Sequence, residues 1–155
     1  MLEFLEHPDN FELWDRNGAE ATLASYGMDP RAYAADVVGM AQCRAALLEA
    51  MPARHKTFLK SLNLSATLGD YFFAHAGVLP GIPLDRQRPR DLMWVRHDFL
   101  DAGEDFGKLV VHGHTPMKEP QIRSNRISID TGAWKYGRLT ALRLHQASRA
   151  FLTVE

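Results

Sequence analysis

The sequence predicts an α+β fold in which a mostly helical segment, residues 1–62, precedes a segment of mostly strands and loops, residues 63–155. Apolar residues recur at helical spacing as far as Leu62. From Leu64 the pattern changes to short unbroken apolar runs bounded by glycine or histidine, which is typical of buried strands. No repeat, low-complexity tract or linker divides the chain, so we expect one domain over residues 1–155.

The composition is that of a globular domain and argues against several classes of function. Hydrophobic residues make up 46% of the 155 positions, enough to build a core. A net charge of -1 and a pI near 6.7 give no basic surface for nucleic acid or an anionic membrane. Cys43 is the one cysteine, which excludes an internal disulfide and suits a reducing compartment. No apolar run approaches the ~20 residues of a membrane span, and no basic signal region opens the chain, so we expect a cytoplasmic protein.

Helix start and stop signals define the first segment. Asp29 followed by Pro30 is the strongest start signal. An aspartate at the N-cap accepts a hydrogen bond from a free backbone amide of the first turn, and proline at the next position has no amide N–H to satisfy. Asn17 and Gly18 form a stop signal. The predicted helices are one through Phe11, Leu13 and Trp14, capped by Asp9 and Asn10; 19–25; 32–48, with an interruption near Gly39; and one that begins at Pro52.

The second segment contains the predicted strands. Gly69 and Asp70 between two apolar runs predict a hairpin, as do Ser124 and Asn125 further on. The predicted strands are 64–68, 71–74, 108–111, 121–123, 126–129, 138–144 and an edge strand at 151–154. Long irregular connections in compact domains are usually functional loops or disordered segments. For the connection 78–107, with a short helix at 92–100, we favour a loop that faces the substrate.

Two of these strands end in histidine. The run 71–74 leads into His75, and the run 108–111 leads into His112 and, across one glycine, His114. If the backbone stays extended, the rings of His112 and His114 point the same way. Ligand sites of open α/β sheets collect at the carboxyl ends of strands, so we expect His75 and His114 to converge. Imidazoles placed in this way suit a metal ion, although each could instead be a partly buried histidine bonded to a backbone carbonyl.

Several motifs, in order, resemble a known family. They are FAHAG at 73–77, DLMWVR at 91–96, VHGHTP at 111–116, IDTGA at 129–133 and GRLTAL at 137–142. Together they resemble the C-terminal half of a metallophosphoesterase, specifically the bacterial serine/threonine protein phosphatase branch of the calcineurin-like superfamily. The resemblance implies part of an αββα sandwich. Family members begin with Gly-Asp-x-His-Gly, Gly-Asp-x-x-Asp-Arg-Gly and Gly-Asn-His-Glu, and none of these occurs here. We therefore expect the first half of the family fold to be missing.

The resemblance also implies roles for particular residues. His75 and His114 match metal ligands of the family, and Arg96 matches its phosphate-binding arginine. His112 and Asp130 would act behind the ligands, by hydrogen bonding and by holding the adjacent loop. Tyr136 and Arg138 are weaker candidates at the pocket edge. The family's catalytic histidine lies in the missing motifs, so no catalytic residue is assigned to this chain.

Complete members of the family hold two divalent metal ions, with manganese expected and iron or zinc as alternatives. This chain supplies two of the ligands, whereas a stable centre usually needs at least three. We therefore expect at most one weakly bound ion and a chain that is weak or inactive alone. Asp70, Asp91 or Asp130 could supply a third ligand only in an arrangement unlike that of the family.

The predicted function is hydrolysis of phosphomonoesters, such as phosphoserine and phosphothreonine in proteins, by metal-activated hydroxide. A dinucleoside polyphosphate hydrolase is an alternative that uses the same metals. A non-catalytic binding or structural module is another. The expected partners are a phosphoprotein or a small phosphoester, with neither nucleic acid nor membrane. Exposed strand edges and apolar faces would favour a homodimer.

Overall fold

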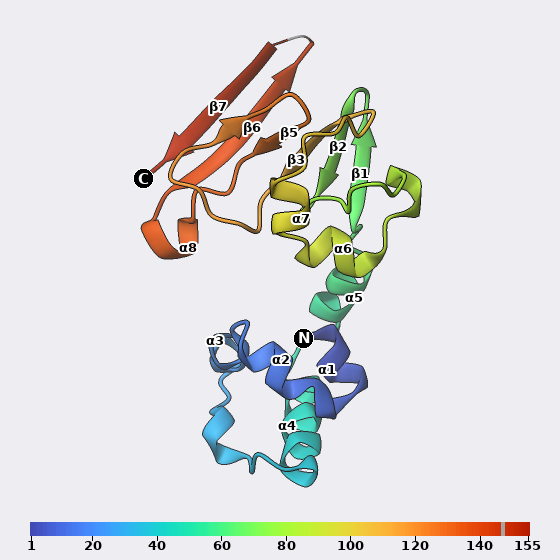
Figure 1. Cartoon of the computed structure of the whole chain (residues 1–155). Helices are drawn as coiled ribbons and strands as arrows, with labels where there is room; N and C mark the ends of the chain where they lie inside the picture. The colour runs from blue at the N-terminus through green and yellow to red at the C-terminus, as the bar shows by residue number, and fades with distance from the viewer. Residues whose placement is uncertain (147) are drawn as a thin grey trace. The chain divides into compact units, whose positions relative to one another are not determined.

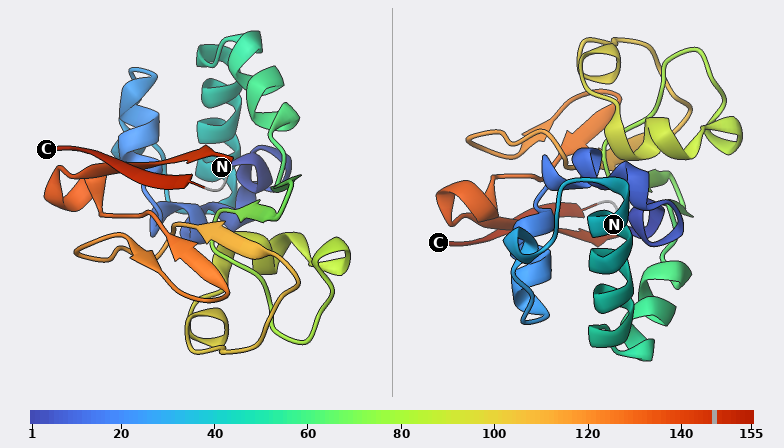
Figure 2. Two further views of the ribbon diagram at one scale, coloured as in Figure 1. Left: turned by 90° about the horizontal axis from the view of Figure 1, so that it is seen from above. Right: turned by 90° about the horizontal axis from the view of Figure 1, so that it is seen from below.

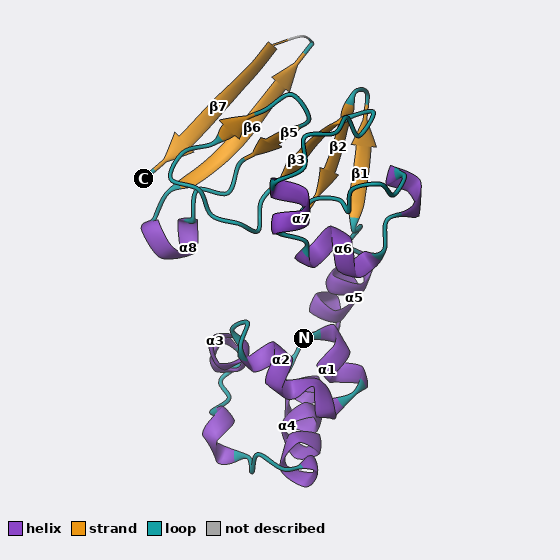
Figure 3. Ribbon diagram, in the orientation of Figure 1, coloured by secondary structure: helices purple, strands orange, loops and turns teal. Residues whose placement is uncertain are grey.

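The computed structural model describes residues 1–146 and 148–155, which form two compact units, Met1–Leu62 and Asn63–Glu155 (Figure 1). Within the described residues, the first unit contains helices, and all strands belong to the second (Figure 3). The predicted α+β class, with N-terminal helices before a mixed sheet, is therefore confirmed. That both units belong to one domain stays a prediction, and each unit is described by itself.

The first unit consists of short helices around one apolar core. Its centre is fully buried and includes Phe4, Leu23, Cys43 and Leu47. The helices are α1 (Leu2–Glu6), α2 (Phe11–Asp15), α3 (Ala19–Ser25), α4 (Val37–Ala50) and α5 (Ala53–Ser61), with single 3-10 turns at Pro8–Asn10 and Pro30–Ala32.

Three sequence-based expectations for this unit were wrong. The helix predicted over 32–48 begins only at Val37, because the carboxylate of Asp36 accepts from the Gly39 amide at 2.7 Å and caps α4 there. Gly39 lies inside α4 without interrupting it, and a Cβ at this position would stand 2.1 Å from the Ala34 carbonyl oxygen. The expected Asn10 cap is also absent, since that residue ends a 3-10 turn and its side chain makes no capping bond to α2.

The second unit contains a five-stranded mixed sheet in the order β1-β2-β3-β5-β4. The three central strands, β2, β3 and β5, run parallel to one another, and the outer strands β1 and β4 pair antiparallel with β2 and β5. The strands are β1 (Ser65–Leu68), β2 (Tyr71–Ala74), β3 (Leu109–His112), β4 (Gln121–Ile122) and β5 (Arg126–Ser128). Strands β6 (Leu139–His145) and β7 (Ser148–Val154) form a separate antiparallel ribbon, coloured red in Figure 2. The predicted final edge strand is thus longer than 151–154.

Alternate residues of the central strands face opposite sides of this sheet. Phe72 and Val110 belong to an apolar cluster with Leu92 and Phe99, which lie on α6 (Pro89–Trp94) and α7 (His97–Leu100). The opposite face contributes Phe73, Val111 and other residues to a cleft of about 520 Å³, to which β6 also contributes. The central strands are therefore covered by helices on one side and border an open cleft on the other.

The helix predicted over 92–100 is in fact two helices. The helix is interrupted at Val95 and Arg96, between α6 and α7. Arg96 has φ -131 and ψ -98, outside the helical region. This break places the Arg96 side chain beside the turn that follows β3. Within the described residues, α8 (Ala133–Tyr136) is the last helix, and no helix is long and apolar enough to cross a membrane.

Candidate metal and phosphate site

The structure brings His75 and His114 together at the carboxyl ends of β2 and β3. Nε2 of His75 lies 3.1 Å from Nδ1 of His114, and the ring centroids are 4.9 Å apart. The two residues are 39 positions apart in the sequence. They become neighbours because β2 and β3 are adjacent parallel strands, with Phe73 opposite Val111. Their role as metal ligands stays a prediction.

Backbone contacts hold the two histidine turns together. The Gly113 amide donates to the carbonyl of His75 at 2.9 Å, which extends the β2–β3 pairing past the ends of both strands. A Cβ at position 113 would lie 3.4 Å from Cβ of Asp130 and 3.7 Å from the His75 carbonyl oxygen. These are ordinary van der Waals distances, so the Gly113 position lies in contact with the segments of His75 and Asp130 without a clash that would require glycine.

The backbone at His114 is strained. Its φ is 65, in the left-handed region that few non-glycine residues adopt. The Thr115 amide donates to the Gly113 carbonyl at 2.7 Å, so the segment forms a three-residue γ-turn centred on His114. Strain of this kind costs about 1–3 kcal/mol and tends to occur at functional sites. The turn directs the His114 ring toward His75.

Burial and the local charges favour the neutral form of His114. Burial, the Arg96 guanidinium and the neighbouring His75 lower the pKa of His114, which favours the uncharged ring that binds metals. Its Nε2 is buried and has no hydrogen-bond partner in the described part of the chain. The His75 side chain is exposed. The His75 imidazole is therefore open to solvent, and the His114 imidazole is half-buried.

Arg96 lies against the same turn. Its Nη1 donates to the His114 carbonyl at 3.3 Å and to Oγ1 of Thr115 at 3.2 Å, and the side chain remains exposed. These contacts leave other N–H groups of the guanidinium for a bound anion. Thr115 was not predicted as a site residue, although its place in the VHGHTP motif, residues 111–116, was a usable signal.

His112 has a different environment from His114. It is 2% exposed, its ring stands edge-on to Phe99 at 4.8 Å between centroids, and its Nδ1 lies 3.2 Å from the Gly113 carbonyl. The expectation that the rings of His112 and His114 point the same way assumed an extended backbone, and the left-handed turn at His114 removes that premise. A role for His112 behind the ligands stays a prediction.

Asp130 pins the loop next to the site. One carboxylate oxygen accepts from the Gly132 amide at 2.9 Å, and its backbone carbonyl accepts from Met117 at 2.9 Å. The first contact closes the loop that follows β5, and the second ties that loop to the segment just after the histidine turn. Arg138 borders the cleft, donates to the Lys118 carbonyl at 3.0 Å and forms an ion pair with Glu119.

The buried His112 predicts a pH dependence of stability. Burial, with a smaller contribution from the Arg126 charge, lowers the pKa of His112 to about 4 from 6.5. Between these values the unfolded chain takes up a proton that the folded chain excludes. This contribution to stability is therefore present above pH 6.5 and is lost as the pH falls to about 4, by at most about 3 kcal/mol.

Urea unfolding of the second unit at pH 7 and pH 4.5, followed by NMR, measures this dependence. His112→Gln lacks the titrating ring and should show a shallower loss of stability on acidification. Identical pH profiles for the two proteins would contradict the assignment.

The spacing of the two imidazoles fits a shared metal ion. Two nitrogens bound to one ion at ~2.1 Å each would lie roughly 3.0–3.4 Å apart. The two imidazole nitrogens are 3.1 Å apart, a separation at which they also hydrogen-bond to each other. The described residues contain no group of three or more histidine, cysteine, aspartate or glutamate side chains that could hold an ion. The Asp91 carboxylate is held by Arg88 at 2.7 Å. The pair thus fits part of a coordination sphere.

Comparison with known proteins gives a partial similarity. No family model matches the chain. A 50-residue stretch, 32% of the chain, is 48% identical to the bis(5'-nucleosyl)-tetraphosphatase PrpE [asymmetrical] of Anoxybacillus flavithermus. A 34-residue stretch, 22% of the chain, is 59% identical to proteins of the same name from Bacillus thuringiensis and Bacillus cereus. The matched stretches span 18% and 14% of the length of these curated relatives. Their name describes enzymes that cleave a bis(5'-nucleosyl) tetraphosphate asymmetrically.

Proposed function

We propose that this chain carries part of a metal-dependent phosphoesterase site, in which His75 and His114 hold a divalent ion and Arg96 binds a phosphoryl group. The observation that carries the proposal is the placement of all three side chains around one turn, with the two imidazole nitrogens 3.1 Å apart and the guanidinium bonded to the same turn. The partial similarity to tetraphosphatases supports a hydrolase of the phosphoesterase kind.

The chemistry of the side chains supports this assignment. A divalent ion, when bound, would ionise a water near neutral pH and offset charge on phosphoryl oxygens. The chain's own contribution is that burial and the Arg96 charge lower the pKa of His114, which favours the uncharged ring that can act as a ligand. Arg96 supplies a fork of donors that suits two oxygens of one phosphate. Its contacts with the His114 carbonyl and Thr115 fix where that phosphate would sit.

The proposed substrate is a dinucleoside polyphosphate. The names of the relatives favour this alternative over the phosphoserine and phosphothreonine substrates that the motif resemblance suggested first. Because the matched stretches are short, hydrolysis of phosphoproteins is kept as the competing proposal and is tested alongside. The predicted manganese requirement, homodimer and cytoplasmic location are likewise proposals.

Metal binding tests the site directly and does not require turnover. We expect Mn²⁺, titrated into the chain and followed by electron paramagnetic resonance, to bind weakly. His75→Ala and His114→Ala should each weaken this binding by at least about tenfold, because each removes one of two ligands. His97→Ala is the matched control, since this exposed ring neighbours Arg96 in sequence and its Nδ1 lies 4.0 Å from Asp101.

Hydrolysis assays with Mn²⁺ then compare diadenosine tetraphosphate, p-nitrophenyl phosphate and a phosphoserine peptide. Turnover that is lost in His114→Ala and kept in His97→Ala would reject the non-catalytic alternative. Metal binding without turnover of any substrate would support that alternative. If Mn²⁺ binds the three histidine variants and the wild type equally, the proposed site is wrong.

A further inference from the structure

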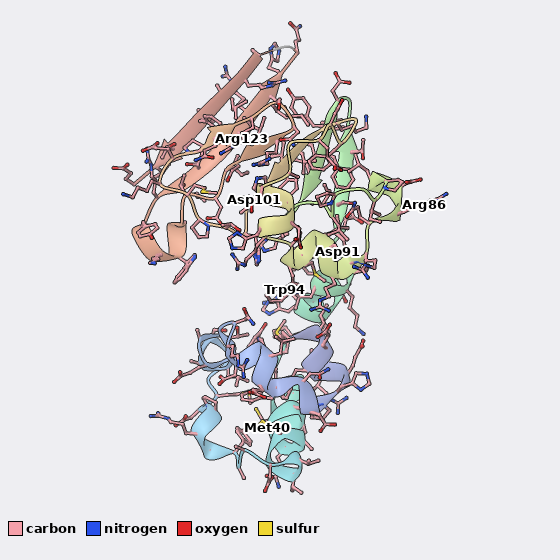
Figure 4. All side chains as sticks on the ribbon, in the orientation of Figure 1. Met40, Arg86, Asp91, Trp94, Asp101 and Arg123 are labelled. Atoms are coloured by element: carbon pink, nitrogen blue, oxygen red, sulfur yellow. The ribbon has the colours of Figure 1, made fainter. Side chains whose placement is uncertain are left out.

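One aromatic side chain beside the candidate site is not required by the core. Trp94 projects from the end of α6 (Figure 4) and is 44% exposed. The same helix is already anchored to the sheet by Leu92, which is 5% exposed, and is followed by Val95, which is 8% exposed. An indole left half open next to polar groups is a common feature of binding surfaces.

The surroundings of Trp94 are those of the phosphate site. Its ring stands at 88° to the His114 ring, with 5.7 Å between centroids. Arg96, two residues further on, bonds the carbonyl of His114 and the hydroxyl of Thr115. An aromatic surface and a phosphate-binding guanidinium therefore contact the same short turn. A ligand that combines a flat ring with a phosphate chain would satisfy both.

We propose that Trp94 stacks on the base of a nucleoside polyphosphate whose phosphates contact Arg96. This inference rests on the proposed function and deepens it, because it assigns the base-binding residue and selects nucleotides over phosphoseryl peptides. Stacking on an indole requires only the π-face that every base has, so this contact accepts all four bases. The histidine pair and Arg96 then act on phosphates, and Trp94 distinguishes nucleotides from simple phosphoesters.

Two ligands with the same diphosphate group separate the base from the phosphates. ADP and inorganic pyrophosphate are titrated into the full chain by calorimetry under identical Mg²⁺ and salt conditions. We expect ADP to bind more tightly, and Trp94→Ala to weaken ADP about 5- to 100-fold while leaving pyrophosphate unchanged. Trp94→Phe keeps an aromatic ring and should retain most of the ADP affinity. Arg96→Ala should weaken both ligands.

Trp134 provides the matched control. It is 82% exposed on α8, and in the described part of the chain no ring contact joins it to either histidine of the pair. Trp134→Ala should leave ADP and pyrophosphate affinities unchanged. NMR spectra of each variant verify that the second unit remains folded.

The outcomes distinguish the stacking role of Trp94 from the proposed phosphate site at Arg96. Equal weakening of ADP and pyrophosphate in Trp94→Ala would show that the indole only positions Arg96, and would overturn stacking. ADP binding no tighter than pyrophosphate in the wild type would also overturn stacking, yet leave the phosphate site intact if Arg96→Ala still weakens pyrophosphate. Pyrophosphate binding that is absent or insensitive to Arg96→Ala would reject the phosphate site and the stacking proposal with it.

Discussion

Replacing Gly77 with alanine should destabilise the second unit by about 3 kcal/mol or more. Gly77 has φ 139, a conformation that side chains rarely adopt, and an added Cβ would stand 2.3 Å from Cδ1 of Phe99. Phe99 is completely buried in the cluster beneath α6 and α7 and cannot swing into solvent. Backbone strain and overpacking therefore add at one position.

Chemical denaturation followed by signals from the second unit measures this loss. Gly81→Ala is the matched control, because Gly81 has φ 74 but no atom of residues 1–146 or 148–155 would lie within 4 Å of its added Cβ. It should cost only the conformational strain, about 1 kcal/mol. Equal losses for the two variants would show that the contact with Phe99 contributes nothing.

The effect of Gly77→Ala should extend to the candidate site. Phe99 stands against His112 at 4.8 Å between ring centroids, and it belongs to α7, whose N-cap is Arg96. Displacing this ring disturbs the residues on both sides of the His114 turn. We therefore expect weaker Mn²⁺ and pyrophosphate binding in this variant, even at temperatures where it remains folded.

Much of the fold could be predicted because burial leaves a local pattern in the sequence. The apolar runs of β2 and β3 and the Gly69-Asp70 hairpin were identified within one residue. The division of 92–100 into two helices was not predictable, because its apolar residues keep helical spacing across the break. Arg96 leaves the helical region while its side chain bonds the His114 turn, a contact between residues 18 positions apart. Such tertiary contacts leave no periodic signal.

The same distinction applies to the candidate site. His75 and His114 were identifiable because each follows a strand and adjoins a small-residue turn, and adjacent parallel strands bring such positions together. The γ-turn at His114 and the Thr115 hydroxyl bond depend on backbone geometry that no spacing rule specifies. The different environments of His112 and His114 follow from that turn. Sequence patterns therefore predicted that His75 and His114 converge, but not how their rings are oriented.

Arg126→Met should lower the free energy of unfolding of the second unit by about 2 kcal/mol or more. The Arg126 side chain comes from β5, is 5% exposed and lies over the Phe99 ring at 5.6 Å from its centroid. It donates to the carbonyls of Leu100 and Ala102, at the end of α7, and to Oδ1 of Asn125 at 3.0 Å. It thereby ties the end of α7 to the sheet.

Two effects oppose each other in this substitution. Burial lowers the pKa of Arg126, a sign that its charge is poorly solvated, and removing it recovers that desolvation cost. Removing it also leaves the Leu100 carbonyl without the side-chain donor, whereas Ala102 keeps a bond from Asn125 at 3.0 Å. We expect the lost bonds to dominate, because hydrogen bonds from charged donors contribute about 1.5–3 kcal/mol each.

Urea denaturation gives the global loss, and hydrogen exchange of the Leu100 amide reports on α7, since this amide donates to the Arg96 carbonyl at 2.8 Å. Arg123→Met is the matched control, as Arg123 is an exposed arginine just after β4 (Figure 4) and should change stability by less than about 0.5 kcal/mol. Faster exchange at Leu100 in Arg126→Met alone would establish that β5 holds α7, and with it Arg96, in place. Unchanged exchange together with unchanged stability would mean that the desolvation cost of the buried guanidinium cancels its hydrogen bonds.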